Sequence, residues 1–304
     1  MNSINPQDST IELSIIVLSY NTQKITVDCL LSIYRSLGQI KLSFEVIVAD
    51  NGSTDGSLKA LYQLQKKLTN FVIIDNKKNL GFSRANNLAA SISRGQYLLF
   101  LNSDVMVLDE AISKLLSFAK KSQDAHFFGG KLLNQDRSAQ ASCGPFFTLP
   151  VVFAFLFLKG DYYGLTRYSP NSVKKVDWVS GACILTKKPY FEKCLGFDEK
   201  IFMYMEEIDL LYRAKQLGFT SCFYPEAHFV HLGSASSSQR TYPILQVYKG
   251  YLYFYHKHQW PISIFLLRLM LQFKARVAII IGQLTKNQYL IQTYEKAYQI
   301  ATMA

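Results

Sequence analysis

Strand-length apolar runs alternate with helix-like segments through the first hundred residues, and this alternation most constrains the fold of the chain. The runs are rich in β-branched residues, which is typical of buried strands. They cover residues 13–19, 44–49, 71–75 and 97–101. Between the first two runs, apolar side chains recur with helical spacing from Ile25 to Leu37. Because parallel strands need such crossover segments, the pattern predicts an α/β fold with a mainly parallel sheet and right-handed connections.

Polar, turn-forming residues follow each of these predicted strands. The carboxyl ends of parallel strands share one edge of a sheet, and in open α/β folds ligands bind along that edge. After the fourth strand the turn reads Asn102-Ser103-Asp104, which places a carboxylate there. Carboxylate oxygens are preferred ligands of Mg²⁺ and Mn²⁺, so Asp104 is positioned to hold a cation against a phosphate. The alternative is an Asx turn without a ligand.

The polar segments, taken in chain order, resemble those of the inverting family 2 glycosyltransferases with a GT-A fold, and most closely their bacterial rhamnosyltransferase-like branch. The first four read Ser-Tyr-Asn, Asp-Asn-Gly-Ser-Thr-Asp-Gly-Ser, Asn-Leu-Gly-Phe-Ser-Arg-Ala-Asn-Asn and Leu-Asn-Ser-Asp. The similar segments of the second half are residues 178–183, 196–199, 202–210 and 228–231. The resemblance covers roughly residues 12–235.

This resemblance implies a GT-A fold, with a mainly parallel Rossmann-like sheet flanked by helices. It implies metal-dependent, inverting addition of one sugar to a lipid-linked saccharide in cell-surface polysaccharide synthesis. The implied donor is dTDP-L-rhamnose first and a UDP-sugar second. Processive synthases of the family carry a Gln-x-x-Arg-Trp motif, which residues 239–240 do not form, so polymerisation is not expected. The alternative is a catalytically inactive nucleotide-sugar-binding protein.

Glycosyl transfer needs a pocket for the nucleoside, a counter-charge for the leaving diphosphate and a base for the acceptor hydroxyl. Asp50, at a strand end, can accept a hydrogen bond from the imide N–H of uracil or thymine, and the ring of Tyr20 offers a stacking face. Arg84 can donate two hydrogen bonds to diphosphate oxygens. The alternatives are a turn cap for Asp50, a packed ring for Tyr20 and a solvated charge for Arg84. The predicted donor-binding residues are Ser19, Tyr20, Asn21, Asp50, Ser53, Asn79, Gly81, Arg84, Asn102, Ser103, Asp104, Trp178 and Gly181.

The predicted metal ligands depart from the pattern of the family. Many relatives have Asp at the first position of the Asp-x-Asp motif, where this chain has Asn102. Asp104 then carries the metal with two diphosphate oxygens, and the resemblance suggests that His231 completes the set. His228 lies three residues earlier and is the alternative, a packing histidine. The implied cofactor is Mn²⁺ or Mg²⁺, and an imidazole ligand suits Mn²⁺ better. The segment of residues 233–236 is predicted to close over the nucleotide.

The catalytic base is predicted to be Glu207, near the start of a helix that follows a loop from residue 197. Glu206, Asp209 and Arg213 share one face of that helix, where they can form an ion-pair stripe. In the resembling family the second acid of a Glu-Asp pair is the usual base, and Glu207 occupies that position with one methylene more. Glu206 is the alternative. A neighbouring carboxylate and partial burial would raise the pKa of the base, and a single displacement would invert the anomeric carbon.

At 304 residues the chain has room for one large domain, which we expect over residues 1–240. Its nucleotide-binding half is expected at about residues 12–105 and its acceptor half at about 106–240, before a C-terminal helical extension over residues 241–304. Five Cys without paired metal spacing indicate reduced thiols in a cytoplasmic protein. The polar residues 1–10 predict no secretory signal peptide before the first strand.

The formal net charge of +11 points to an anionic partner. Lys and Arg are dispersed and form no basic helix, so a membrane surface is favoured over a nucleic acid. Residues 146–158 are too few to span a bilayer, and Arg268, Lys274 and Arg276 interrupt the longer run 262–281. This run predicts a helix that lies in the interface on the inner face of the cell membrane, with packing on the core as the alternative. The predicted belt aromatics are Tyr251, Tyr253, Tyr255 and Trp260.

Overall fold

The computed structural model describes residues 11–38, 41–233, 241–258 and 261–303. Its first half contains β1 (Leu13–Ser19), α1 (Gln23–Leu37), β2 (Phe44–Asp50), α2 (Ser57–Gln65), β3 (Phe71–Asp75), α3 (Phe82–Ile92) and β4 (Tyr97–Asn102). All four predicted strands are confirmed, and β2 and β4 are each one residue longer than predicted. The four strands pair in parallel in the order β3-β2-β1-β4. The polar turns after them therefore meet along one edge of the sheet.

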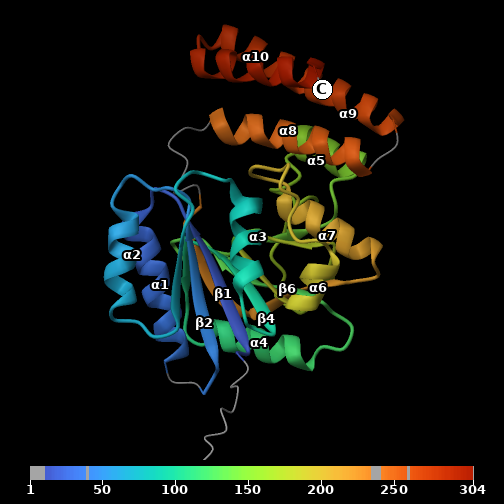
Figure 1. Ribbon diagram of the computed structural model, residues 1–304. Helices are drawn as coiled ribbons and strands as arrows, with labels where there is room; N and C mark the ends of the chain where they lie inside the picture. The colour runs from blue at the N-terminus through green and yellow to red at the C-terminus, as the bar shows by residue number, and fades with distance from the viewer. Residues whose placement is uncertain (1–10, 39–40, 234–240, 259–260, 304) are drawn as a thin grey trace, which may run out of the picture.

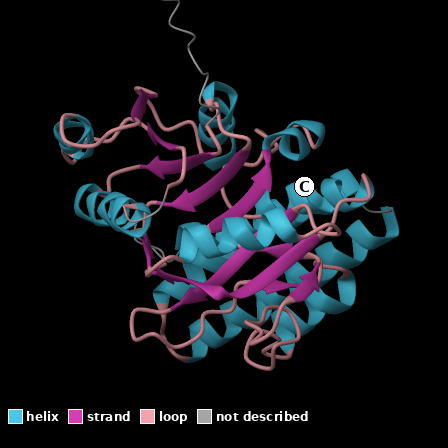
Figure 2. Ribbon diagram, turned by 90° about the horizontal axis from the view of Figure 1, so that it is seen from below, coloured by secondary structure: helices cyan, strands magenta, loops and turns pink. Residues whose placement is uncertain are grey.

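Helices cover both faces of this sheet (Figure 2). The side chains of Leu13, Ile15 and Val17 in β1 join one buried cluster, and that of Ile16 joins the other. This split follows from the two-residue period of a strand, and it explains why the run is apolar at every position rather than at alternate ones. Helices α1 and α2 pack on the first face, whereas α3 packs on the second.

The second half of the sheet combines parallel and antiparallel pairs, so the prediction of a mainly parallel sheet is confirmed for β1 to β4 and only in part beyond them. The further elements are β5 (Val105–Val107), α4 (Ala111–Lys121), β6 (Phe127–Leu133), β7 (Cys143–Gly144), α5 (Leu149–Phe157), β8 (Lys174–Val176), β9 (Trp178–Val179), β10 (Cys183–Lys187), α6 (Lys188–Lys193), α7 (Glu206–Gln216) and β11 (Ser221–His231). Strand β10 is antiparallel to both β4 and β6. Strand β11 is parallel to β6, whereas β5 and β8 are both antiparallel to β11.

Three helices follow the sheet: α8 (Thr241–His258), α9 (Pro261–Leu284) and α10 (Gln288–Met303). They lie beyond the end of the sheet at which β1 and β2 end (Figure 1), and α9 contacts α5. Leu267 and Leu271 of α9 are fully buried, so one face of this helix packs on the protein. Packing on the core was the alternative prediction for residues 262–281. No helix in the described part of the chain is both long enough and apolar enough to cross a membrane.

The predicted aromatic belt is wrong for the tyrosines of α8. Tyr251 and Tyr255 are buried in the core, and the hydroxyl of Tyr253 donates a hydrogen bond of 2.7 Å to Asp198. Helical periodicity turns these side chains inward because α8 packs on the domain. Trp260, residues 1–10, the segment 234–236 and the motif comparison at residues 239–240 lie outside the described residues. The domain boundary at residue 240 stays a prediction for the same reason.

Candidate active site

The turns after β1, β2 and β3 are joined to one another by side-chain hydrogen bonds. The amide of Asn21 donates to the hydroxyl of Ser53 over 2.9 Å. The side-chain amide of Asn51 donates to the side-chain oxygen of Asn79 and to the carbonyl of Gly81, each over 3.2 Å. The structure thus brings Asn21, Ser53, Asn79 and Gly81 together at the carboxyl edge, as the sequence predicted for a donor-binding surface.

Asp50 and Ser19 lie beneath this surface and are fully buried. The carboxylate of Asp50 accepts hydrogen bonds from the amide (2.8 Å) and the hydroxyl (2.7 Å) of Ser53, so it holds the turn in place. The hydroxyl of Ser19 lies 3.3 Å from that of Thr26, inside the protein. Tyr20, between them and the edge, is half-buried. Contacts of Asp50 and Tyr20 with a nucleobase stay predictions.

The turn at Gly81 docks onto the loop that leads to α7. Gly81 has φ +80°, and a Cβ atom built there would lie 2.8 Å from the carbonyl oxygen of Phe202. The amide of the next residue, Phe82, donates to that same carbonyl over 2.9 Å. Only glycine combines this backbone conformation with so close an approach. Arg84 is exposed one turn further, with Glu199 at 3.8 Å, so its guanidinium is accessible to a diphosphate.

Trp178, another predicted donor-binding residue, turns its side chain into the hydrophobic core. It is 3% exposed, its ring stacks on Phe147, and its Nε1 donates to the carbonyl of Pro145 over 2.8 Å. The ring therefore stabilises the interior and is not brought to the edge. Gly181 is brought there: a Cβ atom on it would lie 3.6 Å from the Cβ of Glu207.

Asp104 and His231 face each other across the end of the sheet. Strand β11 is antiparallel to β5 and places His231 opposite Val105, the residue after Asp104. The Nε2 atom of His231 lies 3.3 Å from Oδ1 of Asp104. The carbonyl of His228 instead accepts from the amide of Leu108, at the other end of β5, so His228 is not brought to Asp104.

The other two residues of the Asn102-Ser103-Asp104 turn lie beside this pair. Asn102 donates its amide to the carbonyl of Ala182 over 3.2 Å, and the hydroxyl of Ser103 lies 3.4 Å from that of Thr22. The described ranges contain no group of three or more His, Cys, Asp and Glu that could hold an ion. An ion between Asp104 and His231 would therefore take further ligands from other groups, such as substrate oxygens or water.

Glu206 and Glu207 begin α7 after two residues with left-handed backbone, Tyr204 (φ 67°) and Met205 (φ 75°). Burial raises the pKa of Glu207, and the nearby amides of the helix start and of Gly181 offset the rise only in part. The carboxyl of Glu206 is buried, and its Oε2 has no hydrogen-bond partner. Burial and the charge of Glu207 raise the pKa of Glu206 well above its ordinary value. Glu206 is thus buried beside a half-buried Glu207, which lies next to Gly181 at the edge.

The predicted ion-pair stripe on α7 is wrong for Glu206 but correct for Asp209 and Arg213, which pair over 2.8 Å. Asp209 also contacts Lys257 (2.8 Å) and His258 (2.6 Å) of α8. Burial alone would raise the pKa of Asp209, but His258, Arg213 and Lys257 together lower it to about 2. This cluster fastens α7, the helix that carries Glu207, to α8. Glu206 takes no part in the cluster, because its side chain is buried and its Oε2 has no hydrogen-bond partner.

Two polar residues near the edge were missed in the sequence. Arg167 pairs with Asp161 over 3.0 Å, and its positive charge acts on Glu207. Gln140 lies 2.7 Å from the Nδ1 atom of His231. Both come from the stretch between β6 and β8, which carries none of the recognised motifs, so no local signal could have found them.

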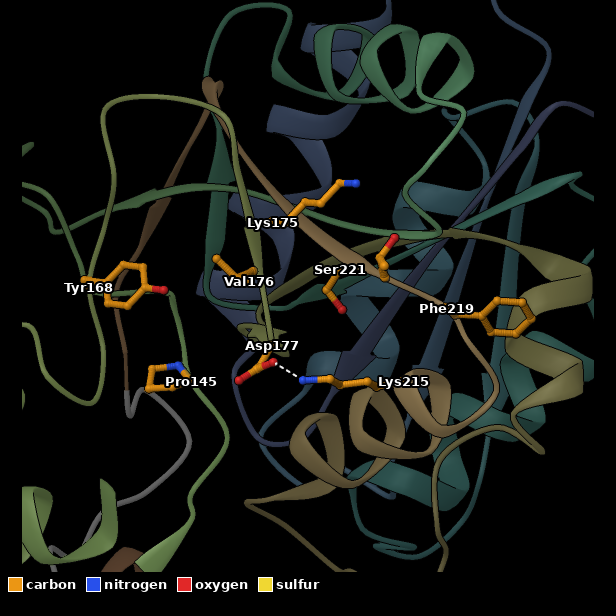
Figure 3. Close-up of a pocket in the computed structure, with 9 residues that line it drawn as sticks. Pro145, Tyr168, Lys175, Val176, Asp177, Lys215, Phe219 and Ser221 are labelled. Atoms are coloured by element: carbon orange, nitrogen blue, oxygen red, sulfur yellow. Dashed lines mark hydrogen bonds and ion pairs between the residues drawn. The ribbon is translucent and has the colours of Figure 1, made fainter. Parts of the chain in front are cut away.

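A cavity of about 300 Å³ lies elsewhere, between the start of β11 and the end of α7 (Figure 3). Its wall includes Tyr168, Ser221 and the ion pair of Asp177 with Lys215 (2.7 Å). Ser221 begins β11 and His231 ends it, so the cavity lies at the opposite end of this strand from the Asp104–His231 pair. It contains none of the predicted site residues.

The sheet and its flanking helices form a GT-A fold, and similarity to known proteins identifies a glycosyltransferase. More particularly, the chain carries a domain of glycosyl transferase family 2, because residues 14–162 match the sequence model of that family. The mannosyltransferase PcManGT from Pyrobaculum calidifontis, in complex with GDP-Man and Mn²⁺, has the same fold. It superposes with a TM-score of 0.63 and 15% identity over 95% of this chain and 85% of that one.

Two curated relatives are named rhamnosyltransferases. N-acetylglucosaminyl-diphospho-decaprenol L-rhamnosyltransferase of Mycobacterium tuberculosis (strain CDC 1551 / Oshkosh) is 29% identical over 220 residues, which cover 65% of this chain and 70% of that protein. Rhamnosyltransferase WbbL of Escherichia coli (strain K12) is 25% identical over 218 residues, covering 61% of this chain and 82% of that protein. These similarities agree with the branch that the motifs resemble.

Proposed function

We propose that this glycosyltransferase adds one L-rhamnose from dTDP-L-rhamnose to a lipid-linked saccharide, with inversion and with a divalent metal ion. The observation that carries the proposal is the position of Glu207, Gly81 and the Asp104–His231 pair on one edge of the sheet. The names of the two curated relatives support rhamnose and the lipid-linked acceptor. A UDP-sugar is the second donor candidate.

Asp104 and His231 fit a divalent ion by their chemistry and by their separation. A carboxylate oxygen and an imidazole nitrogen together suit Mn²⁺ better than Mg²⁺. Two adjacent ligands that each lie about 2.1 Å from one ion are about 3 Å apart, close to the 3.3 Å between Oδ1 and Nε2. Such an ion would supply positive charge to the diphosphate as it leaves.

The side chains then have distinct parts in a single displacement. The carboxylate of Glu207 accepts the proton of the acceptor hydroxyl while that oxygen bonds to the anomeric carbon. The bond from the anomeric carbon to the diphosphate breaks on the opposite side, so the configuration inverts. Arg84, exposed at the start of α3, donates to the diphosphate oxygens and offsets their growing charge.

A panel of sugar nucleotides tests the donor. With Mn²⁺ and a polyprenyl-diphosphate-linked saccharide, we expect release of dTDP from dTDP-L-rhamnose at least about tenfold faster than release of UDP from UDP-sugars, because a matched pocket discriminates by one to a few kcal/mol. The measurement is the rate of nucleoside diphosphate release. Tight nucleotide binding without release of any diphosphate would favour the alternative, an inactive binding protein.

We further propose that the exposed face of α9 rests on the inner surface of the cell membrane. This face is mostly apolar, with Arg276 and Gln283 as its exposed polar side chains. Its exposed apolar residues are Ile262, Phe265, Leu266, Leu269, Phe273, Ile280, Ile281 and Leu284. The ring of Phe273 lies 5.8 Å from that of Phe157, so the surface continues onto α5. The net charge of +11 adds attraction to anionic lipids.

Replacing Ile262, Phe265 and Leu269 together by Ser is expected to weaken binding to anionic vesicles at least about tenfold, since three exposed apolar side chains are removed from the contact. Sedimentation with phosphatidylglycerol vesicles measures this change. The remaining binding should fade with added salt, because charges are screened.

The matched control replaces Leu31, Leu88 and Ile92, three exposed apolar residues of α1 and α3, by Ser. It should bind vesicles as the unchanged protein does. Equal losses in both triple variants would contradict a membrane face on α9.

A further inference from the structure

A chain of hydrogen bonds runs from the loop after β6 to His231. The hydroxyl of Ser138 donates to the carboxylate of Asp136 over 2.6 Å, and Nδ2 of Asn134 donates to that hydroxyl over 2.9 Å. Nε2 of Gln140 donates to Oδ1 of Asn134 (3.0 Å) and to the carbonyl of His231 (3.2 Å). The chain ends at His231, whose Nδ1 lies 2.7 Å from Oε1 of Gln140.

In this chain of hydrogen bonds, the donor and the acceptor of each bond can be assigned in only one way. A carboxylate accepts only, so the single proton of Ser138 goes to Asp136, and Ser138 must accept from the amino group of Asn134. The side-chain carbonyl of Asn134 then faces Gln140 and must accept a hydrogen bond from the amino group of Gln140. The carbonyl of Gln140 therefore faces His231, and Nδ1 of His231 must carry the proton.

A neutral imidazole with its proton on Nδ1 has its lone pair on Nε2. In this structure Nε2 is the atom that faces Oδ1 of Asp104, at 3.3 Å. Two acceptors that face each other are held together by a cation between them, which is either a proton or a metal ion. The loop thus prepares His231 to bind a metal ion before any ion or donor arrives, which lowers the cost of ordering the site.

We propose that Gln140 is a positioning residue that fixes the Nδ1–H tautomer and the ring orientation of His231 for metal binding through Nε2. This inference rests on the proposed metal site of Asp104 and His231. Outer partners of this kind change metal affinity by about 10- to 100-fold when they are removed. Gln140 touches neither the donor nor the ion in this arrangement, since its side chain is occupied by His231 and Asn134.

Gln140→Leu tests the inference with two measurements that need no turnover. In the metal-free protein at pH 8 to 9, ¹⁵N NMR of the His231 ring should show Nδ1–H in the unchanged protein and a loss of this preference in the variant. Titration with Mn²⁺ in the presence of dTDP, followed by electron paramagnetic resonance, should show affinity weakened about 10- to 100-fold.

Two further variants make the result specific. Gln140→Glu keeps an acceptor for Nδ1–H but loses the donor to Asn134 and to the carbonyl of His231, so it should retain the tautomer, and an unchanged melting temperature shows that the loop still folds. Gln63→Leu, at an exposed position of α2, should leave both measurements unchanged.

The outcomes separate this inference from the proposed function. If the unchanged protein binds Mn²⁺ and Gln140→Leu binds it equally well, or if His231 carries its proton on Nε2, the role of Gln140 is refuted while the metal site stands. If the unchanged protein binds no Mn²⁺ with dTDP, the metal site and the role of Gln140 both fail.

Discussion

Replacement of Glu207 by Gln is expected to slow transfer by about 10² to 10⁴-fold while donor affinity changes little. Gln retains the shape of the side chain and its hydrogen bonds to the start of α7, but it cannot accept the proton of the acceptor hydroxyl. The measurement is single-turnover transfer from a bound donor, compared with donor binding by calorimetry.

Glu206→Gln is the matched control, at the adjacent position of the same helix. Burial and the charge of Glu207 raise the pKa of Glu206 well above its ordinary value, and Gln is a neutral side chain of nearly the same shape, so the change is mild at this buried position. Transfer should fall far less than in Glu207→Gln. If Glu206 proves indispensable and Glu207 dispensable, the base is Glu206; if neither matters, the single-displacement mechanism is wrong.

The pH dependence of transfer follows from the same carboxyl. A base must be ionised to accept a proton, and burial raises the pKa of Glu207 above the ordinary value for Glu. The rate should therefore fall as the pH drops through this raised pKa, at a higher pH than for a solvated Glu. In Glu207→Gln the transfer rate should be low at every pH, and it should no longer fall as the pH drops.

The parallel half of the fold was predictable because its signals are local. A buried parallel strand is apolar at every position, as in β1, and each strand is followed by polar turns whose residues the sheet must gather at one edge. The position of Asn21, Ser53, Gly81 and Asp104 after successive strands was therefore enough to predict that they share one surface. The resemblance to a family added His231 and Glu207, which the sheet alone would not have selected.

The rest depends on contacts between residues far apart in the chain. Strand β10 is antiparallel to β4, and nothing in the sequence of β10 indicates this direction. Asp209 is fixed by Lys257 and His258 of α8, which helical spacing within α7 cannot show. Gln140 and Arg167 look like ordinary surface residues until the fold places them beside His231 and Glu207.

Replacement of Asp104 by Asn is the second large effect that we expect. The change keeps the size of the side chain and removes one negative charge and a preferred oxygen ligand of Mn²⁺. Donor binding in the presence of Mn²⁺ should weaken at least about 100-fold, and donor binding without metal should stay as weak as in the unchanged protein. Calorimetric titration of dTDP-L-rhamnose with and without Mn²⁺ measures both.

The fold should survive this substitution, because the structural hydrogen bond of Asp104 is made by its backbone carbonyl, which accepts from the amide of Leu232 over 3.0 Å. Asp124→Asn is the control for loss of a charge: its side chain is 83% exposed, and its ion-pair partner Lys175 lies 3.8 Å away. That control should bind donor and Mn²⁺ normally. If Asp104→Asn keeps the full metal-dependent affinity with an unchanged melting temperature, Asp104 is not a metal ligand. The Asp104–His231 pair would then be a contact within the sheet edge, and the charge of the leaving diphosphate would have to be offset by Arg84 and other cationic side chains.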